Sequence, residues 1–126
     1  MSFSYRFDTA AGSVVFTGDT GPSDAVTRLA KGADVLVSEA SLPGGGGARP
    51  TTGSPLAREL ANHMAQEHLT PEDIGKMAPA AGVKTVILTH LVIGNSPDAA
   101  ERLKDGVRQY FSGTVIVGHD LLKFDL

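Results

Sequence analysis

The chain has 126 residues, a formal net charge of −3, 41% hydrophobic residues and no cysteine. This length suits one domain, residues 1–126, that buries roughly two thirds of its unfolded surface. The charge provides no basic surface for nucleic acid or an anionic membrane, so a nucleic acid partner is disfavoured although not excluded. The absence of cysteine excludes disulfides, thiolate zinc sites and cysteine nucleophiles. Without a long apolar run or a signal peptide core, we expect a cytoplasmic protein and no membrane partner.

The first expected element is a β-hairpin over residues 3–17 with its turn at Ala11-Gly12. In its first strand, apolar residues alternate with polar ones as in a half-buried strand: Phe3, Tyr5 and Phe7. Its second strand, residues 13–17, ends abruptly in turn-forming residues that include Asp19. A carboxylate at the end of a buried strand is held rigidly, as a metal ligand or general base must be.

A helix and a buried strand are expected next. Pro22-Ser23 is typical of a helix start, and Gly32 of a helix end. The inward face of this helix should contain Val26, Leu29 and Ala30. Residues 34–38 form the predicted strand, with Glu39 at its end. The glycine run 44–47 that follows lacks the spacing and the lysine of a phosphate-binding loop, so we interpret it as a loop at the rim of a site.

Two helices follow, the first from Ser54-Pro55 to about His68 and the second from Thr70-Pro71 to Gly82. The inner face of the second should contain Ile74, Met77, Ala78 and Ala81. The most continuously apolar strand, residues 83–89, is expected inside the sheet and is followed by His90.

The last elements are a helix from Ser96-Pro97, a strand over residues 114–117 and an edge strand over residues 121–124. The helix should turn Leu103, Val107 and Tyr110 inward. This order of elements predicts an α/β fold, a mixed β-sheet with helices on one face.

Four residues are expected to converge at one edge of this sheet: Asp19, Glu39, His68 and His90. Carboxylate oxygen and imidazole nitrogen are ligands shared by zinc, manganese and iron. The spacing alone leaves other interpretations open, because Asp19 could cap the following helix and His90 could be an ordinary turn residue. His68 could equally lie at a helix C-terminus beside the negative end of the dipole. His63 and His119 match no pattern, and surface positions are the better prediction for both.

Four segments together resemble the C-terminal half of a metallo-β-lactamase-fold hydrolase, in the branch of the tRNA 3′-processing endonucleases and their arylsulfatase-like and phosphodiesterase-like relatives. They are residues 16–23 (Phe-Thr-Gly-Asp-Thr-Gly-Pro-Ser), 29–40, 68–73 and 86–91. The resemblance implies half of an αββα sandwich and a metal-dependent hydrolase with two zinc ions, or manganese or iron, in its complete site.

The resemblance also implies roles for single residues. Asp19 corresponds to the aspartate that bridges two metal ions, and His90 to a ligand of the second ion. Glu39 corresponds to the acidic residue of a His-Glu-Ala-Thr segment, which reads Ser-Glu-Ala-Ser here. His68 corresponds to the histidine that pairs with this glutamate and assists proton transfer to the leaving group.

Other family features are not in this sequence. The His-x-His-x-Asp-His motif is absent, and residues 91–94 (Leu-Val-Ile-Gly) replace the expected arginine-containing segment, which favours a small ester or phosphodiester over tRNA. We therefore expect an isolated chain without activity, whose site is completed by a missing N-terminal half. The alternative is a non-catalytic module that pairs with itself or with a partner. Strands that are apolar on both faces predict association through the uncovered sheet face, as a face-to-face dimer or with that missing half.

Overall fold

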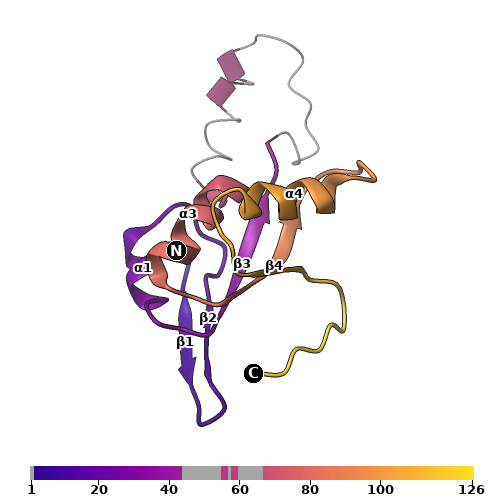
Figure 1. The fold of residues 1–126 in the computed structure, drawn as a ribbon. Coiled ribbons are helices and arrows are strands. Elements are labelled where there is room, and N and C mark those ends of the chain that lie inside the picture. Colours follow the sequence, from indigo (N-terminus) through magenta and orange to yellow (C-terminus); the bar gives the residue numbers. More distant parts are fainter. Residues whose placement is uncertain (1, 44–54, 57, 60–66) are drawn as a thin grey trace.

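The protein was analysed as a computed structural model that describes residues 2–43, 55–56, 58–59 and 67–126. Figure 1 shows its elements along the chain. In order they are β1 (Tyr5–Asp8), β2 (Ser13–Phe16), α1 (Asp24–Leu29), β3 (Val35–Ser41), α3 (Pro71–Ala81), β4 (Thr85–Val92), α4 (Ala99–Arg108) and β5 (Thr114–Val117).

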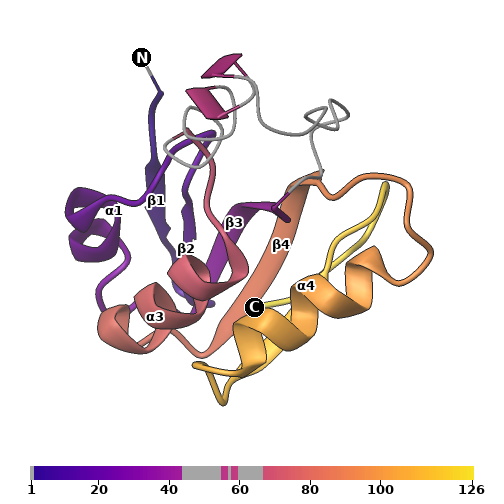
Figure 2. The same ribbon diagram turned by 90° about the horizontal axis from the view of Figure 1, so that it is seen from above.

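The five strands form one sheet in the order β1-β2-β3-β4-β5. The hairpin pair β1–β2 is antiparallel, whereas β2, β3, β4 and β5 pair in parallel. Parallel neighbours need crossover connections, and these are where the helices lie. Helices α1, α3 and α4 lie together on one face of the sheet (Figure 2). The predicted mixed sheet with helices on one face is therefore confirmed.

The core lies between this face and the helices. Alternate residues of the strands point towards the helices, as the two-residue period of a strand requires. The strand residues of this core are Val15, Leu36, Val86, Leu88 and Val115. The helices contribute apolar residues at helical spacing, among them Val26, Ile74, Met77, Leu103 and Val107. Because β2, β3, β4 and β5 run parallel, their carboxyl ends lie at a common edge of the sheet.

Helix α3 has the most complete end signals. The Thr70 side chain accepts a hydrogen bond from the Asp73 amide, and the Asp73 carboxylate accepts one from the Thr70 amide, which is a capping box. The helix ends at Gly82, whose φ of +73° is a left-handed conformation that glycine adopts without strain. These signals fix the start of α3 directly after His68 and Leu69.

The other sheet face carries an exposed aromatic patch, which consists of Phe3, Tyr5, Phe7 and Phe16. These side chains are 40–62% exposed. The prediction that the first strand is half-buried is wrong for its aromatic residues, because they point away from the helices. The rings of Phe7 and Phe16 meet edge to face at 6.0 Å.

Two strands extend further than predicted. Strand β3 continues to Ser41, and β4 runs from Thr85 to Val92. Glu39 and His90 therefore lie inside strands and not after their ends. The reason is a bulge: Glu39 pairs with Thr89 and Ala40 with Leu91, so that His90 is the extra residue on β4 and pairing resumes beyond it.

The C-terminal part departs from the prediction in three places. Residues 121–124 form no strand, because Leu121 has a φ of +63° and the Leu122 amide closes a turn on the His119 carbonyl. Helix α4 begins at Ala99, since Ser96 and Pro97 precede its N-cap, Asp98. Tyr110 follows the helix and is exposed, whereas Leu103 and Val107 are buried as predicted.

The loop at residues 44–47, His63 and most of the predicted helix 54–68 lie outside the described residues; Pro55, Leu56, Arg58, Glu59 and Glu67 are helical. In the described part of the chain, none of the helices has both the length and the apolar character that crossing a bilayer requires.

Candidate metal centre

Asp19 lies in the turn that follows β2. The strand ends at Phe16, and Gly18 has a φ of +68°, so the chain turns sharply before Asp19. A Cβ atom on Gly18 would lie 2.4 Å from the Phe3 carbonyl oxygen, which leaves glycine as the residue that fits. Thr17 is fully buried, and its hydroxyl oxygen accepts a hydrogen bond from the Glu39 amide at 3.2 Å. The turn is thereby attached to the neighbouring strand.

Glu39 is buried at the centre of the site, with 2% of its surface exposed. Its Oε1 accepts hydrogen bonds from two backbone amides, Thr20 at 3.2 Å and Leu69 at 3.0 Å. Its Oε2 lies 2.6 Å from His68 Nδ1. One carboxylate therefore connects the loop that carries Asp19 with the loop that carries His68.

His68 and His90 reach the site from different elements. His68 lies at a bend just before α3, where the buried Leu69 anchors the chain. His90 is the bulged residue of β4 and has a φ of +44°. The two imidazole rings are stacked, with their centroids 6.2 Å apart. The bulge directs His90 towards the Asp19 loop, as bulges beside functional sites often do.

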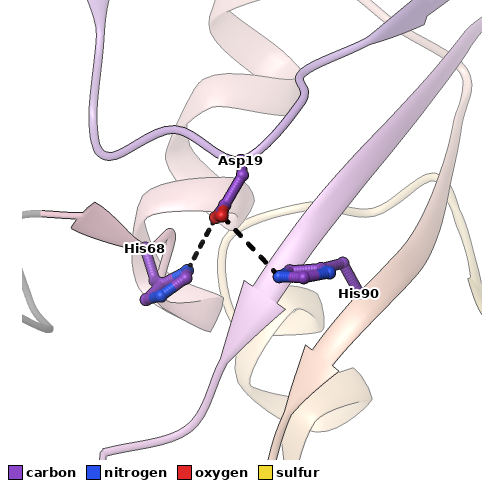
Figure 3. A group of neighbouring side chains, drawn as sticks. All are labelled: Asp19, His68 and His90. Carbon is purple, nitrogen blue, oxygen red and sulfur yellow. Dashed lines mark ion pairs between the residues drawn. The ribbon is translucent and has the colours of Figure 1, made fainter. Parts of the chain in front are cut away.

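The Asp19 carboxylate lies between the two imidazoles (Figure 3). Its Oδ1 is 3.0 Å from His68 Nδ1, and its Oδ2 is 3.8 Å from His90 Nε2. The Asp19 and His90 side chains are each 59% exposed, whereas that of His68 is 13% exposed. The site thus has an accessible side, formed by Asp19 and His90, and a buried side, formed by His68 and Glu39.

Burial and pairing perturb the two buried groups. The hydrogen bond to Glu39 raises the pKa of His68 above its ordinary value, although partial burial opposes it. Burial raises the pKa of Glu39, while the His68 ring and the Leu69 amide counteract this shift. A carboxylate that holds an imidazolium in this way keeps a proton available near neutral pH.

Asp19, His68 and His90 also fit a metal ion. One ligand atom from each lies within 4.8 Å of the others. Around a tetrahedral zinc ion with bonds of roughly 2.0–2.1 Å, neighbouring ligand atoms lie roughly 3.4 Å apart, so small side-chain movements would suffice. Two imidazole nitrogens and a carboxylate oxygen form a donor set that zinc, manganese and iron accept.

All four residues singled out in the sequence lie together in the structure, and His119 is exposed. Sequence reasoning missed the backbone amides of Thr20 and Leu69 and the hydroxyl of Thr17. Every residue except proline has a backbone amide, so the residue types in the sequence do not show which amides bind Glu39. The position of His90 within a bulge was also missed, because the register of strand pairing is set by partners distant in sequence.

Comparisons with known proteins relate the chain to ribonuclease Z by sequence. No family model matches the chain. It is 29% identical over 122 residues to ribonuclease Z of Mycobacterium tuberculosis strain H37Rv, which covers 97% of this chain and 42% of that protein. It is 30% identical over 115 residues to ribonuclease Z of Methanosarcina mazei, which covers 90% and 32%. The chain thus spans less than half the length of these two curated relatives.

Solved structures agree on the fold. The metallo-β-lactamase-fold protein YhfI from Bacillus subtilis superimposes with a TM-score of 0.67 at 23% identity, over 91% of this chain and 40% of that one. Together with the sequence relationship above, this structural similarity shows which fold the five-stranded sheet and its helices belong to. The chain has a partial metallo-β-lactamase fold and is related to ribonuclease Z, of which it corresponds to a part.

Proposed function

We propose that this chain contributes part of the site of a metal-dependent hydrolase that cleaves an ester or phosphodiester bond. The observation that carries the proposal is the Asp19 carboxylate held between His68 and His90, with ligand atoms close enough to share an ion. The exposed side chains of Asp19 and His90 are the proposed metal ligands. The resemblance to complete metallo-β-lactamase-fold enzymes implies two zinc ions in the whole site, or manganese or iron.

The buried pair, Glu39 and His68, is the proposed source of the proton for the leaving group. Glu39 holds the His68 ring through a 2.6 Å contact, and this contact raises the pKa of the imidazole. His68 can therefore donate a proton to the leaving group as the bond breaks. When bound, the metal supplies Lewis-acid chemistry and makes water a better nucleophile. The net charge of −3 favours a small-molecule substrate, although the ribonuclease name of the relatives makes RNA a substrate to include in tests.

A two-metal site needs more ligands than Asp19 and His90, the two that we propose among the described residues. We propose that a complementary half binds the sheet face that carries the aromatic patch. A non-catalytic module that associates with such a partner is the alternative, and the same exposed face favours it.

Zinc binding by the purified chain tests the proposal. We expect weak binding that Asp19→Ala and His90→Ala each abolish, and negligible hydrolysis of a model phosphodiester by the chain alone. His119→Ala is the matched control, since His119 is another exposed histidine whose loss should leave zinc binding unchanged. Zinc binding that is insensitive to Asp19→Ala and His90→Ala would contradict the proposed ligands. A chain that binds no zinc even at millimolar concentration would favour the non-catalytic module.

A further inference from the structure

We infer that Thr17 is a positioning residue for Asp19: its hydroxyl ends strand β2 and turns the following peptides, so that Asp19 reaches the two imidazoles. Thr17 is fully buried and lies directly after β2, which ends at Phe16. The turn follows from contacts within this chain alone, whereas its effect on zinc binding rests on the function proposed above.

The hydrogen bonds between β2 and β3 are regular up to the Thr17 amide. Phe16 pairs with Val37, and the Thr17 amide donates to the Val37 carbonyl at 3.0 Å. Because the bonds of a parallel pair are evenly spaced, the next one would run from the Glu39 amide to the Thr17 carbonyl. The Glu39 amide instead donates to the Thr17 hydroxyl at 3.2 Å. The side chain of Thr17 thus takes the place of its own backbone carbonyl.

The replaced carbonyl points to the other side of the strand. Tyr5 pairs with Phe16, so Ser4 lies opposite Thr17 in the same register. The Ser4 hydroxyl donates to the Thr17 carbonyl at 2.6 Å. A carbonyl that would face β3 in a continued strand is therefore directed towards the chain that leads into β1. The peptide between Thr17 and Gly18 is turned over and held there by Ser4.

The next peptide is held by the Thr17 hydroxyl itself, which donates to the Gly18 carbonyl at 2.8 Å. Ser4 and Thr17 thus fix the peptides before and after Gly18, whose φ of +68° accommodates the sharp change of direction. A continued strand would carry Asp19 further along the sheet. The turn instead brings Asp19 Oδ1 to 3.0 Å from His68 Nδ1 (Figure 3). Thr17 therefore acts on the site through Asp19.

Backbone NMR chemical shifts of the metal-free chain test the turn. Thr17→Val keeps the shape of the side chain but removes the hydroxyl, so the Glu39 amide has to turn to the carbonyl of residue 17. The strand should then continue, and the carbon shifts of Gly18 and Asp19 should move towards extended values. Thr17→Ser retains a hydroxyl and should keep the natural shifts. Natural shifts at Gly18 and Asp19 in a folded Thr17→Val chain would overturn the inference.

Ser4→Ala tests the same peptide from its other side and decides the matter if Thr17→Val does not fold. Ser4 is half-buried and precedes the edge strand, so the chain should tolerate its replacement. Without the Ser4 donor, the Thr17 carbonyl can compete for the Glu39 amide. The Gly18 shifts should move in the same direction as in Thr17→Val, by a smaller amount, because the Thr17 hydroxyl remains. Unchanged Gly18 shifts would mean that the peptide is not held in this way, which also refutes the inference.

Zinc affinity, measured by calorimetry, tests the effect on the site. Thr17→Val should bind zinc about tenfold more weakly than the natural chain, and Thr17→Ser should stay within about threefold of it. Ser13→Ala is the matched control at the opposite end of β2. The Ser13 hydroxyl also accepts a backbone amide and donates one hydrogen bond, both with Asp34. Its loss should lower stability and leave zinc affinity unchanged.

Two results would contradict the positioning role of Thr17. One is equal zinc affinity in Thr17→Val and the natural chain, and the other is an equal loss of affinity in Thr17→Val and Ser13→Ala. A natural chain that binds no zinc would count against the proposed function, while the NMR shifts at Gly18 and Asp19 would still decide whether Thr17 sets the turn.

Discussion

His90 occupies a backbone conformation that residues with side chains seldom adopt, with a φ of +44° at the bulge of β4. This conformation costs an ordinary residue about 1–2 kcal/mol, and glycine avoids most of that cost. The strain is located at a proposed metal ligand, where such outliers tend to occur. The stability of the fold and the direction of the His90 side chain are therefore in competition at this position.

This competition predicts an unusual order of stability among variants at position 90. His90→Gly should be more stable than His90→Ala by about 1 kcal/mol in urea unfolding, since only alanine retains the strain. At the neighbouring Thr89, which is an exposed position in the same strand, the order should be reversed, because glycine weakens an extended strand. An alanine variant at position 90 that matches or exceeds the glycine variant would show that the bulge relaxes without histidine.

Glu39 is the residue on which both site loops depend. Its Oε1 accepts the amides of Thr20 and Leu69, while its Oε2 contacts His68. Glu39→Gln keeps an oxygen for the two amides and removes the charge. Glu39→Ala leaves the buried Leu69 amide without its acceptor, which costs about 1–3 kcal/mol.

We therefore expect Glu39→Ala to unfold at clearly lower urea than Glu39→Gln. Zinc affinity, measured by calorimetry, should fall about 10-fold or more in the alanine variant, as it does when residues that orient ligands are lost. The glutamine variant should lose less, because both loops keep their connection. Equal losses in the two variants would mean that the charge of Glu39, and not the loop connection, organises the site.

At the scale of elements, a carboxylate at the other end of the sheet joins three strands. Asp34, directly before β3, accepts hydrogen bonds from the Ser13 amide at 2.9 Å and from its hydroxyl at 3.1 Å. It also binds Lys84, directly before β4, at 2.6 Å. The Lys84 hydrogen bond and the Ser13 bonds lower the pKa of Asp34 to about 2. The amino ends of β2, β3 and β4 are thereby connected by one group.

This shift predicts a pH dependence. The pKa of Asp34 is lower in the folded than in the unfolded chain, so its contribution to stability is present above pH about 4 and is lost as the pH falls towards 2. In urea unfolding over this range, Asp34→Asn should reduce the slope of stability against pH. Asp125→Asn, at an exposed position near the C-terminus, serves as the control. An unchanged slope in Asp34→Asn would show that other carboxylates determine acid unfolding.

At the scale of the whole molecule, the two faces of the sheet differ. The helices bury one face, while the aromatic patch of Phe3, Tyr5, Phe7 and Phe16 remains exposed on the other. Exposed apolar surface of this kind marks a binding surface more often than a free one. That residues 1–126 form a single domain stays a prediction, and so does the face-to-face dimer expected from the sequence.

The patch predicts dye binding. The double variant Phe7→Ser/Phe16→Ser should roughly halve the fluorescence of a bound apolar dye such as ANS. Its free energy of unfolding should change by less than about 1 kcal/mol, since both residues are largely exposed. Phe124→Ser is the control, because Phe124 is similarly exposed but lies in the C-terminal segment outside the patch. Equal dye binding by the natural chain and the double variant would locate the apolar surface elsewhere.

The sequence by itself determined the elements whose signals are local. The capping residues of α3 and the apolar period of α4 follow from neighbouring residues, and α3 was predicted at its observed bounds, whereas β3 and β4 extend further than predicted. The order of Asp19, Glu39, His68 and His90 along the chain was also enough to predict the site, because the carboxyl ends of parallel strands lie at one edge of a sheet.

Tertiary structure decided what depends on partners distant in sequence. The bulge at His90 is defined by the register against Glu39, and the exposure of Phe7 depends on which face the helices cover. The connection of Thr20 and Leu69 through Glu39 joins backbone groups 49 positions apart. Such contacts involve backbone amides, which every residue except proline has, so no local pattern distinguishes them, and only the packed chain selects which of them form.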